Sequence, residues 1–380
     1  MSKMRRKELL IIVFIIPHIC FAEIFKGTIG KYPIVISFSL KDIGRYSDKG
    51  GYFYESKRQN IIFTEATGNE NHIVLKAGYE NDNSIEKFDL TRNSDGSYSG
   101  TWTNKSKKTY PVQISTFDIK SVKNKHYNLQ KINEPIDELW YIASSKLNFN
   151  IDTMVFVGKH KIEWLKDNIY GVSFFRIVSN RNPDLNKLLV NKHLELINSL
   201  FRGCNCDAEN FEPFEIIETG ANIISYSFKN GICYCYSAAH PVWGEETDNL
   251  DLQRDKVLDF DEVFAFSKTT VPNQEKQSLE WSTYRQEFVA PKIIEFLKKI
   301  DKSLLPTPQN YKRGDDEECY ILETEYWWAL ENWLLNKKSI KITHYDSARG
   351  YGPCMQSFEI PSKFLKTNLR EAYKTRIFKN

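Results

Sequence analysis

Residues 24–40 read IFKGTIGKYPIVISFSL, two runs in which apolar and polar side chains alternate on either side of Gly30-Lys31. A period of two is that of a β-strand with one buried face, and a glycine between two such runs favours a tight turn. The stretch therefore predicts two neighbouring strands joined by a short turn.

The same rhythm continues to about residue 119. Six more alternating segments follow, separated by turns rich in Gly, Asn and Asp: 50–56, 60–67, 72–79, 86–92, 96–103 and 110–115. Because no helical pattern interrupts them, we expect an all-β antiparallel meander, a barrel or sandwich, over residues 23–119. The stretch SGTWT (99–103) also resembles strands of lipocalin-like and avidin-like barrels. A barrel this small is expected to be filled by its own side chains.

The first 22 residues have the layout of a cleavable secretory signal peptide. Basic residues at 3–7 precede an apolar run at 9–16 that is too short to span a bilayer, and Cys20-Phe21-Ala22 offers a cleavage site before Glu23. We expect cleavage there rather than a retained anchor or a lipoprotein at Cys20. The expected location is periplasmic or secreted, with no membrane span after cleavage.

The charge balance disfavours one class of partner. The chain has 52 Lys and Arg and 49 Asp and Glu, and its first 22 residues hold four of the former and one of the latter, which leaves 48 of each. A net charge near zero provides no large basic field for nucleic acid or for an anionic membrane. The length that remains exceeds what one hydrophobic core usually holds, so a second domain is expected.

The second half mixes helical and strand patterns. Residues 120–155 are expected to be a connector with the first strands of the second domain, within 138–158, and residues 156–380 to be an α+β domain. The expected elements are strands over 161–178, a helix over 182–201 capped by Asp184, a hairpin over 223–239 around Asn230-Gly231, and helices over 278–305 on both sides of Pro291.

Six of the seven cysteines lie outside the signal peptide, all in the second half. An even number in an exported chain favours disulfides. Each of the two Cys-x-Cys motifs would place both sulfurs on one face of a strand, which suits neighbouring disulfides better than a zinc knuckle or a redox pair. The expected bridges join Cys204 and Cys206 to Cys233 and Cys235, in an order that stays open, and Cys319 to Cys354.

Several motifs over about residues 160–370 follow one another in a familiar order. A helix with LNKLLVNKHLELINSL (185–200) precedes the loop SAAHPVWG (237–244), then LDLQRDKVLDFDEVF (250–264) and finally SFEIPSKFL (357–365). That order resembles the extracellular domain shared by RsiV-type lysozyme-sensing anti-sigma factors and by the accessory region of certain peptidoglycan deacetylases. The residues that fit the family's pattern are Asp251, Lys256, Leu258, Phe260, Glu262, Phe264, Phe358, Ile360, Pro361 and Leu365.

The resemblance implies an envelope protein of the lysozyme-associated or cell-wall-associated kind. The sensors carry a sigma-binding tail and a membrane helix, which a signal peptide and a β domain replace here, so sigma-factor control is not implied. The metal-binding signatures of the deacetylases are absent from the sequence. No nucleophile elbow, phosphate-binding glycine loop or His-Glu-x-x-His motif occurs either, and we expect neither an enzyme nor a cofactor or metal.

Two loops and one tryptophan are candidate binding positions. His240 follows three small residues and precedes Pro241, which favours an extended loop open to close approach, although a turn-building histidine is the commoner case. The acids after it indicate a solvated acidic loop rather than a calcium site. The stretch HYDSARGYGP (344–353) has the aromatic and Arg content of interfaces, and a tryptophan at 328 can contact sugar or protein when it is not buried. The candidates are His240, Pro241, Trp243, Trp328, Tyr345, Arg349 and Tyr351.

These features predict a non-catalytic binding protein of the cell envelope. Its expected partner is a lysozyme-like or other peptidoglycan-acting protein, whose cleft a rigid loop would occlude. The alternatives are a periplasmic immunity protein that neutralises one cognate secreted toxin, a peptidoglycan-binding or glycan-binding module, and an enzyme that acts on wall fragments.

Overall fold

The computed structural model describes residues 23–38, 50–77, 86–127, 135–202, 205–206, 215–234, 242–267, 278–300, 332–344 and 356–378. Its contacts divide the chain into two compact units, Met1–Lys146 and Leu147–Asn380, which are called unit 1 and unit 2 below. The predicted signal peptide lies outside the described residues. Among the helices in these ranges, none is both long and apolar enough to cross a membrane.

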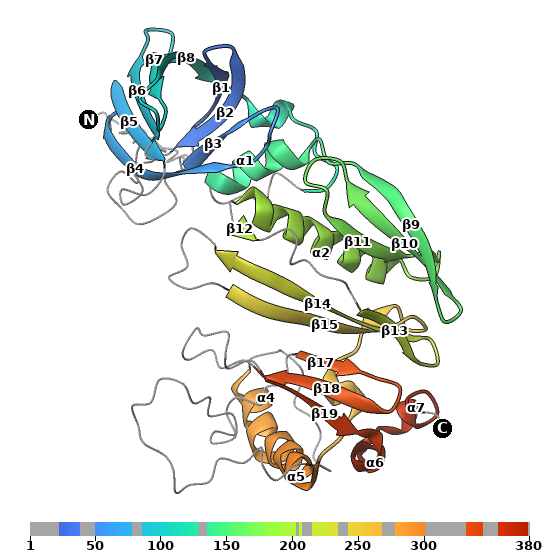
Figure 1. Ribbon diagram of the computed structural model, residues 1–380. Coiled ribbons are helices and arrows are strands. Elements are labelled where there is room, and N and C mark those ends of the chain that lie inside the picture. Colours follow the sequence, from blue (N-terminus) through green and yellow to red (C-terminus); the bar gives the residue numbers. More distant parts are fainter. Residues whose placement is uncertain are drawn as a thin grey trace, which may run out of the picture. The chain divides into compact units, whose positions relative to one another are not determined.

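Unit 1 contains a closed barrel of eight antiparallel strands, which confirms the fold class predicted from the alternation (Figure 1). Strand β1 pairs with β2 and also with β8, and this second pairing closes the sheet. Gly30 adopts a φ of +58° in the turn after β1, which glycine reaches without strain. The strands are β1 (Glu23–Ile29), β2 (Tyr32–Phe38), β3 (Gly50–Tyr54), β4 (Ile61–Asn69), β5 (His72–Ala77), β6 (Glu86–Arg92), β7 (Tyr98–Thr103) and β8 (Thr109–Thr116).

Aromatic side chains fill the barrel. Phe25 stacks on Phe38 with ring centroids 5.0 Å apart, and Tyr98 meets Phe38 edge-on at 5.8 Å. Tyr52 and Phe88 form another edge-on pair at 4.9 Å. None of these five side chains is more than 1% exposed. The barrel is therefore a packed core, as expected for a sheet of this size.

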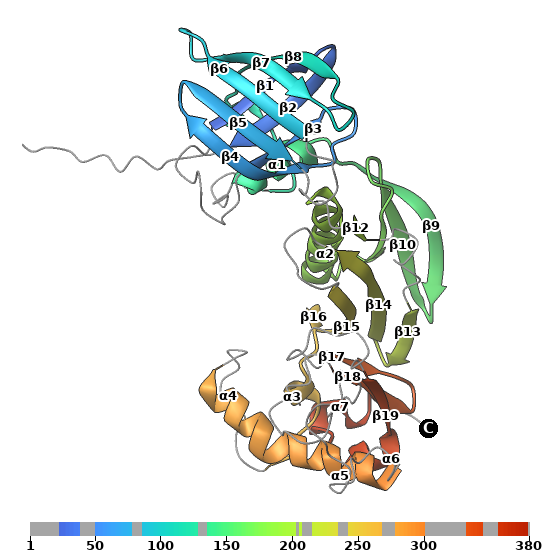
Figure 2. The same cartoon turned by 60° about the vertical axis from the view of Figure 1, so that its left-hand side comes forward.

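A helix covers part of the outer wall of the barrel. After the short η2 (Ile119–Ser121), helix α1 (Pro135–Ser144) packs against β2 and β3 (Figure 2). Strands were expected within 138–158, and β9 (Phe149–Val157) lies there, whereas residues 138–144 belong to this helix. The acids at 137 and 138 favour a helix N-terminus, and residues 138–143 are all buried, whereas a strand would bury alternate positions.

Unit 2 is α+β, as predicted, and its described residues form three small antiparallel sheets. The strand orders are β11-β10-β9, β12-β14-β15-β16 with β13 also paired to β14, and β17-β18-β19. The strands are β9 (Phe149–Val157), β10 (His160–Asp167), β11 (Ser173–Ile177), β12 (Asn205–Cys206), β13 (Glu215–Gly220), β14 (Ile223–Tyr234), β15 (Val242–Asp251), β16 (Lys256–Val257), β17 (Asn332–Leu335), β18 (Ser339–His344) and β19 (Gln356–Pro361). The helices are α2 (Pro183–Phe201), α3 (Phe260–Val263), α4 (Leu279–Tyr284), the π-helical η5 (Arg285–Val289), α5 (Ala290–Ile300), α6 (Ser362–Leu365), η10 (Lys366–Asn368) and α7 (Glu371–Lys374).

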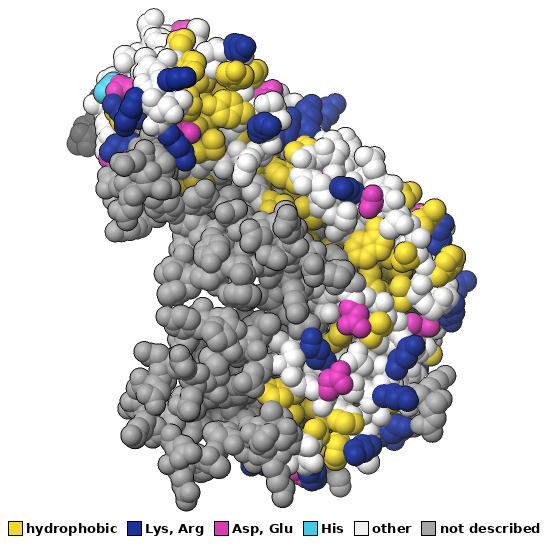
Figure 3. Space-filling view, in the orientation of Figure 1, with side chains coloured by type: hydrophobic (Ala, Val, Ile, Leu, Met, Phe, Trp, Pro, Cys, Tyr) yellow, Lys and Arg dark blue, Asp and Glu magenta, His cyan; other side chains and the backbone are white. Residues whose placement is uncertain are grey.

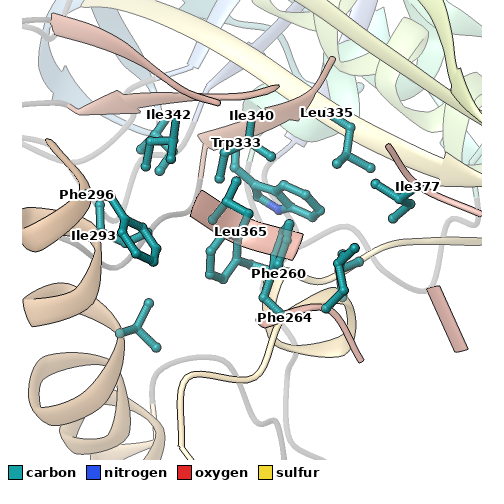
Figure 4. Packing of buried hydrophobic residues seen from close by; sticks show 14 of the residues in the cluster. Phe260, Phe264, Ile293, Phe296, Trp333, Leu335, Ile340, Ile342, Leu365 and Ile377 are labelled. Atoms are coloured by element: carbon teal, nitrogen blue, oxygen red, sulfur yellow. The ribbon is translucent and has the colours of Figure 1, made fainter. Parts of the chain in front are cut away.

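Two hydrophobic clusters are seen among the described residues of unit 2. In the first, leucines of α2 such as Leu185 and Leu189 pack with side chains of β10, β11, β14 and β15. The second surrounds Trp333 of β17, which meets Phe260 edge-on at 5.3 Å (Figure 4). Ile293 and Phe296 of α5 close this cluster from the helical side.

Two local expectations for unit 2 are wrong. The chain does not turn at Asn230-Gly231, because β14 continues to Tyr234 and pairs with β15 around an irregularity between Asn230 and Cys233. Pairing with β15 keeps this segment in the strand, and Asn230-Gly231 is accommodated as a bulge instead of a turn. Asp184 does not cap α2 either. The carboxylate of Asp255 accepts hydrogen bonds from the amides of Asp184 and Leu185 at 2.9 and 3.1 Å instead.

Candidate functional site

Most of the binding residues predicted from the sequence lie outside the described residues: His240, Pro241, Trp328, Tyr345, Arg349 and Tyr351. Trp243 lies in β15. The stems of the two candidate loops are described. Segment 235–241 joins β14 to β15 behind the pair Cys233–Val242, and segment 345–355 joins β18 to β19 behind the pair His344–Gln356.

Both stems open at the same end of unit 2. The carbonyl of Trp333 accepts hydrogen bonds from Thr247 at 3.2 Å and from Asn249 at 3.0 Å, and the amide of Leu335 donates to Asn249 at 2.8 Å. Strand β17 therefore runs beside β15 in the same direction (Figure 1). Because Asn332 pairs with Thr343, the end of β18 points toward the same end of unit 2 as the start of β15. The sequence could not show this, since the contact joins segments far apart in the chain.

A cluster of charged side chains lies between α2 and the sheet, close to this end. Lys192 Nζ is 3.0 Å from Asp248 Oδ2 and 3.3 Å from Glu246 Oε2, and the hydroxyl of Tyr226 donates to Asp248. Burial acts to lower the pKa of Lys192, but the two carboxylates outweigh it and raise that pKa. Burial also raises the pKa of Tyr226. Lys192 therefore stays protonated and Tyr226 neutral near pH 7, and neither is a ready nucleophile.

Titratable side chains elsewhere in the described ranges form no metal centre. No group of three or more His, Cys, Asp or Glu residues among them is close enough to hold a metal ion. His193 of α2 is 3% exposed, with Nε2 2.9 Å from the carbonyl oxygen of Val172, and burial lowers its pKa. It is a neutral core histidine that packs on Phe149 and Phe174.

The residues that carry the sequence resemblance belong to the core of unit 2. Leu258, Phe260, Phe264, Phe358, Ile360 and Leu365 are all members of the cluster around Trp333. Lys256 pairs with Glu262, and the carboxylate of Asp251, which is fully buried, binds the guanidinium of Arg376. The shared pattern therefore specifies packing and ion pairs of the fold rather than a binding site.

Among the described residues of unit 2, strand β9 carries most of the exposed large apolar side chains. Its residues 150–156 are all exposed, whereas a strand with one buried face would alternate. We define the β9 surface by the apolar side chains of Ile151, Met154, Val155 and Phe156, which are 52, 53, 38 and 73% exposed. Figure 3 shows hydrophobic side chains on this part of unit 2 with Lys and Arg side chains beside them.

Strand β9 is also an open edge. It pairs with β10 on one side, and no described strand pairs with its other side. Lys159 and Lys161, at the turn between β9 and β10, have no carboxylate partner among the described residues, and Lys161 lies opposite Phe156 in the ladder. A long apolar edge strand with free backbone groups is a template for pairing with another chain.

The register of β12 bears on the predicted disulfides. Cys206 lies directly opposite Cys233 in the β12–β14 pair. Opposite residues of antiparallel strands have Cα atoms about 4.5–5.5 Å apart, within the range of about 4.4–6.8 Å that a disulfide requires. Among the orders left open by the sequence, we predict a Cys206–Cys233 bond. Non-reducing peptide mapping by mass spectrometry of the protein purified without reductant tests it, and a bond from Cys206 to Cys235 would contradict it.

Comparison with known proteins identifies only solved structures. No protein-family model and no curated protein matches the chain. The structural neighbours are DUF3298 proteins. One, from Pseudomonas aeruginosa, is 14% identical with a TM-score of 0.28, and the match covers 59% of this chain and 92% of that one. Another, from Bacteroides fragilis, is 13% identical with a TM-score of 0.32, and the match covers 60% and 95%. We base no functional argument on likeness at this level.

Proposed function

We propose that the chain is a non-catalytic binding protein of the cell envelope, and that its partner is a lysozyme-like or other peptidoglycan-acting protein. The observation that carries this proposal is the β9 surface, which offers both apolar side chains and unpaired backbone groups to another protein. The sequence resemblance to lysozyme-sensing domains supports the choice of partner class. The signal-peptide pattern supports the location.

The form of β9 favours docking by strand addition. A strand of the partner would continue the β11-β10-β9 sheet through main-chain hydrogen bonds, and its side chains would cover Met154 and Phe156. Lys159 and Lys161 favour a partner strand with a carboxylate at that end. The loops at 235–241 and 345–355, with His240, Tyr345 and Arg349, are the second contact that we propose, because their stems share one end of unit 2.

Replacing Phe156 by Lys is expected to weaken partner binding by at least about tenfold, because truncating or charging a central apolar contact typically costs about 2 kcal/mol or more. The matched control is Leu279→Lys on α4, which changes a side chain that is 82% exposed and belongs to neither proposed contact. The measurement is titration calorimetry with an animal lysozyme and with a bacterial muramidase, together with inhibition of peptidoglycan hydrolysis.

Three outcomes would change the proposal. Equal affinity of the Phe156→Lys variant for a hydrolase that binds would remove β9 from the site. Binding to one cognate secreted effector, with no effect on either hydrolase, would favour an immunity protein. Retention of the chain on purified peptidoglycan without any other protein present would favour a glycan-binding module.

A further inference from the structure

Three polar side chains are buried on α1 and on the outer wall of the barrel near the strands that α1 contacts. Glu138, on the first turn of α1, is 3% exposed, Ser37 of β2 is fully buried, and Asn60, just before β4, is 3% exposed. Ser37 lies opposite Gly51 in the β2–β3 ladder. A Cβ atom on Gly51 would come within 2.7 Å of Asn60 Oδ1, so the amide of Asn60 covers that glycine.

These groups have unused hydrogen-bonding capacity. Oε2 of Glu138, Oγ of Ser37 and both amide atoms of Asn60 are buried without a hydrogen-bond partner. A carboxylate only accepts, whereas a protonated carboxyl group also donates. Protonated Glu138 can therefore donate a hydrogen bond as well as accept one, and Ser37 is the neighbouring hydroxyl group that acts on its carboxyl group. Ionised Glu138 would leave a charge in a contact that offers it one hydroxyl group, and a buried unpaired charge is strongly disfavoured.

No described cation offsets that charge. On α1 the neighbouring titratable group is Asp137, whose own charge opposes ionisation of Glu138. The residues of β2 and β3 on the outer face, beside Ser37, are Val35, Gly51 and Phe53, none of which titrates. The remaining charged or titratable groups packed near α1 lie toward its C-terminal end: Arg58, which donates to the carbonyl of Ala143 at 2.9 Å, and Lys123, Lys125 and His126 in the segment that bonds to Tyr141 and Ser144.

We propose that Glu138 makes the contact between α1 and the barrel a proton-dependent latch: the helix stays docked while this carboxyl group is protonated and opens more often once the group is ionised. Burial, partly opposed by the Ser37 hydroxyl and assisted by Asp137, raises the pKa of Glu138 from 4.5 to about 7. A carboxyl group whose pKa is raised by folding stabilises the docked state at low pH. It loses this contribution as the pH rises through its folded value. The latch therefore loosens progressively as the pH rises from about 4.5 to about 7.

Hydrogen exchange of the full chain tests the latch. After correction for intrinsic exchange rates, peptides from α1 should show an opening constant at least about tenfold larger at about pH 8.5 than at about pH 5.5, because a shift of this size links opening to proton release. In the Glu138→Gln variant the ratio should fall below about twofold, since the amide cannot ionise. Peptides from β6 and β7 serve as the internal reference for the barrel.

Two further variants keep the result interpretable. Glu138→Met removes the titrating group with an apolar side chain of similar size, and it should also abolish the pH response. Asp137→Asn removes the adjacent acid and should keep the response of the wild type. A wild-type helix that opens equally at both pH values would overturn the proposal, as would a response that persists in both Glu138 variants.

Discussion

Replacing Asp261 by Leu is expected to lower the free energy of unfolding of unit 2 by about 3–5 kcal/mol, because it leaves the guanidinium of Arg285 buried without a counter-charge. Nε and Nη2 of Arg285 donate to Asp261 Oδ2 at 2.9 and 2.8 Å. The two side chains are only 6 and 2% exposed. Burial raises the pKa of Asp261 and lowers that of Arg285, so desolvation outweighs their mutual attraction.

A double variant distinguishes the cost of leaving Arg285 unpaired from the cost of losing the Asp261 side chain itself. Asp261→Leu combined with Arg285→Met replaces both charges by apolar side chains, and such replacements of buried pairs are often neutral within a few kcal/mol. The double variant should therefore recover most of the stability lost in the single variant. It should remain about 1–3 kcal/mol less stable than the wild type, because Trp281 Nε1 loses its acceptor, Asp261 Oδ2, at 3.1 Å. The stability of the single and of the double variant is measured by urea unfolding, with hydrogen exchange of peptides from α3 and α5 as the probe. A double variant no more stable than the single one would contradict the explanation.

Arg376→Met is expected to cost about 3–5 kcal/mol and to loosen the C-terminal segment from the sheet. Its guanidinium donates to both oxygens of Asp251, at 2.7 and 2.6 Å, and Asp251 is fully buried. The remaining donors to that carboxylate include the amides of Gln253 and Arg254. The amides carry no charge, and the guanidinium of Arg254, whose Nε is 3.9 Å from Asp251 Oδ2, is a longer and partly exposed partner that offsets the buried charge only in part.

The matched control lies two residues away. Lys374 pairs with Glu371 at 2.7 Å, but the two side chains are 49 and 88% exposed. Exposed pairs contribute about 0–1 kcal/mol, so Lys374→Met should leave the stability almost unchanged. Thermal unfolding of both variants, with hydrogen exchange of the peptide that contains Tyr373, gives the comparison. Equal effects of the two substitutions would show that the pair with Asp251 does not hold this segment.

The barrel was predictable because its determinants are local. Residues 24–40 alternate with the period of a strand and turn at a glycine, and the structure pairs Ile29 with Tyr32 on either side of that turn. The helix over 182–201 and the strands around Gly171 were predictable for the same reason, since each carries its own periodicity. The turn predicted at Asn230-Gly231 does not form, because the two residues lie within β14, which pairs with β15 on both sides of them.

The surfaces that matter for function were less accessible to sequence reasoning. Residues 149–157 look like any strand with alternating apolar positions, and only the sheet order shows that β9 stays open on one side. In the sequence, Glu138 is an acid at the start of a segment in which we expected strands, and acids are usually exposed. Its burial depends on the barrel wall against which α1 packs, which no local pattern encodes. The predicted loop residues remain predictions, since all but Trp243 lie outside the described residues.

The pairing of β1 with β8 has a consequence for engineering. Phe25 lies opposite Thr116, and the amide of Phe117 donates to the carbonyl of Ile24 at 2.8 Å, so the barrel starts and finishes at one point. Segments whose ends meet in this way tolerate circular permutation and insertion into other proteins. New termini can thus be opened at the exposed turn around Lys107, in a barrel whose outer face on β2 and β3 still needs α1 as its cover.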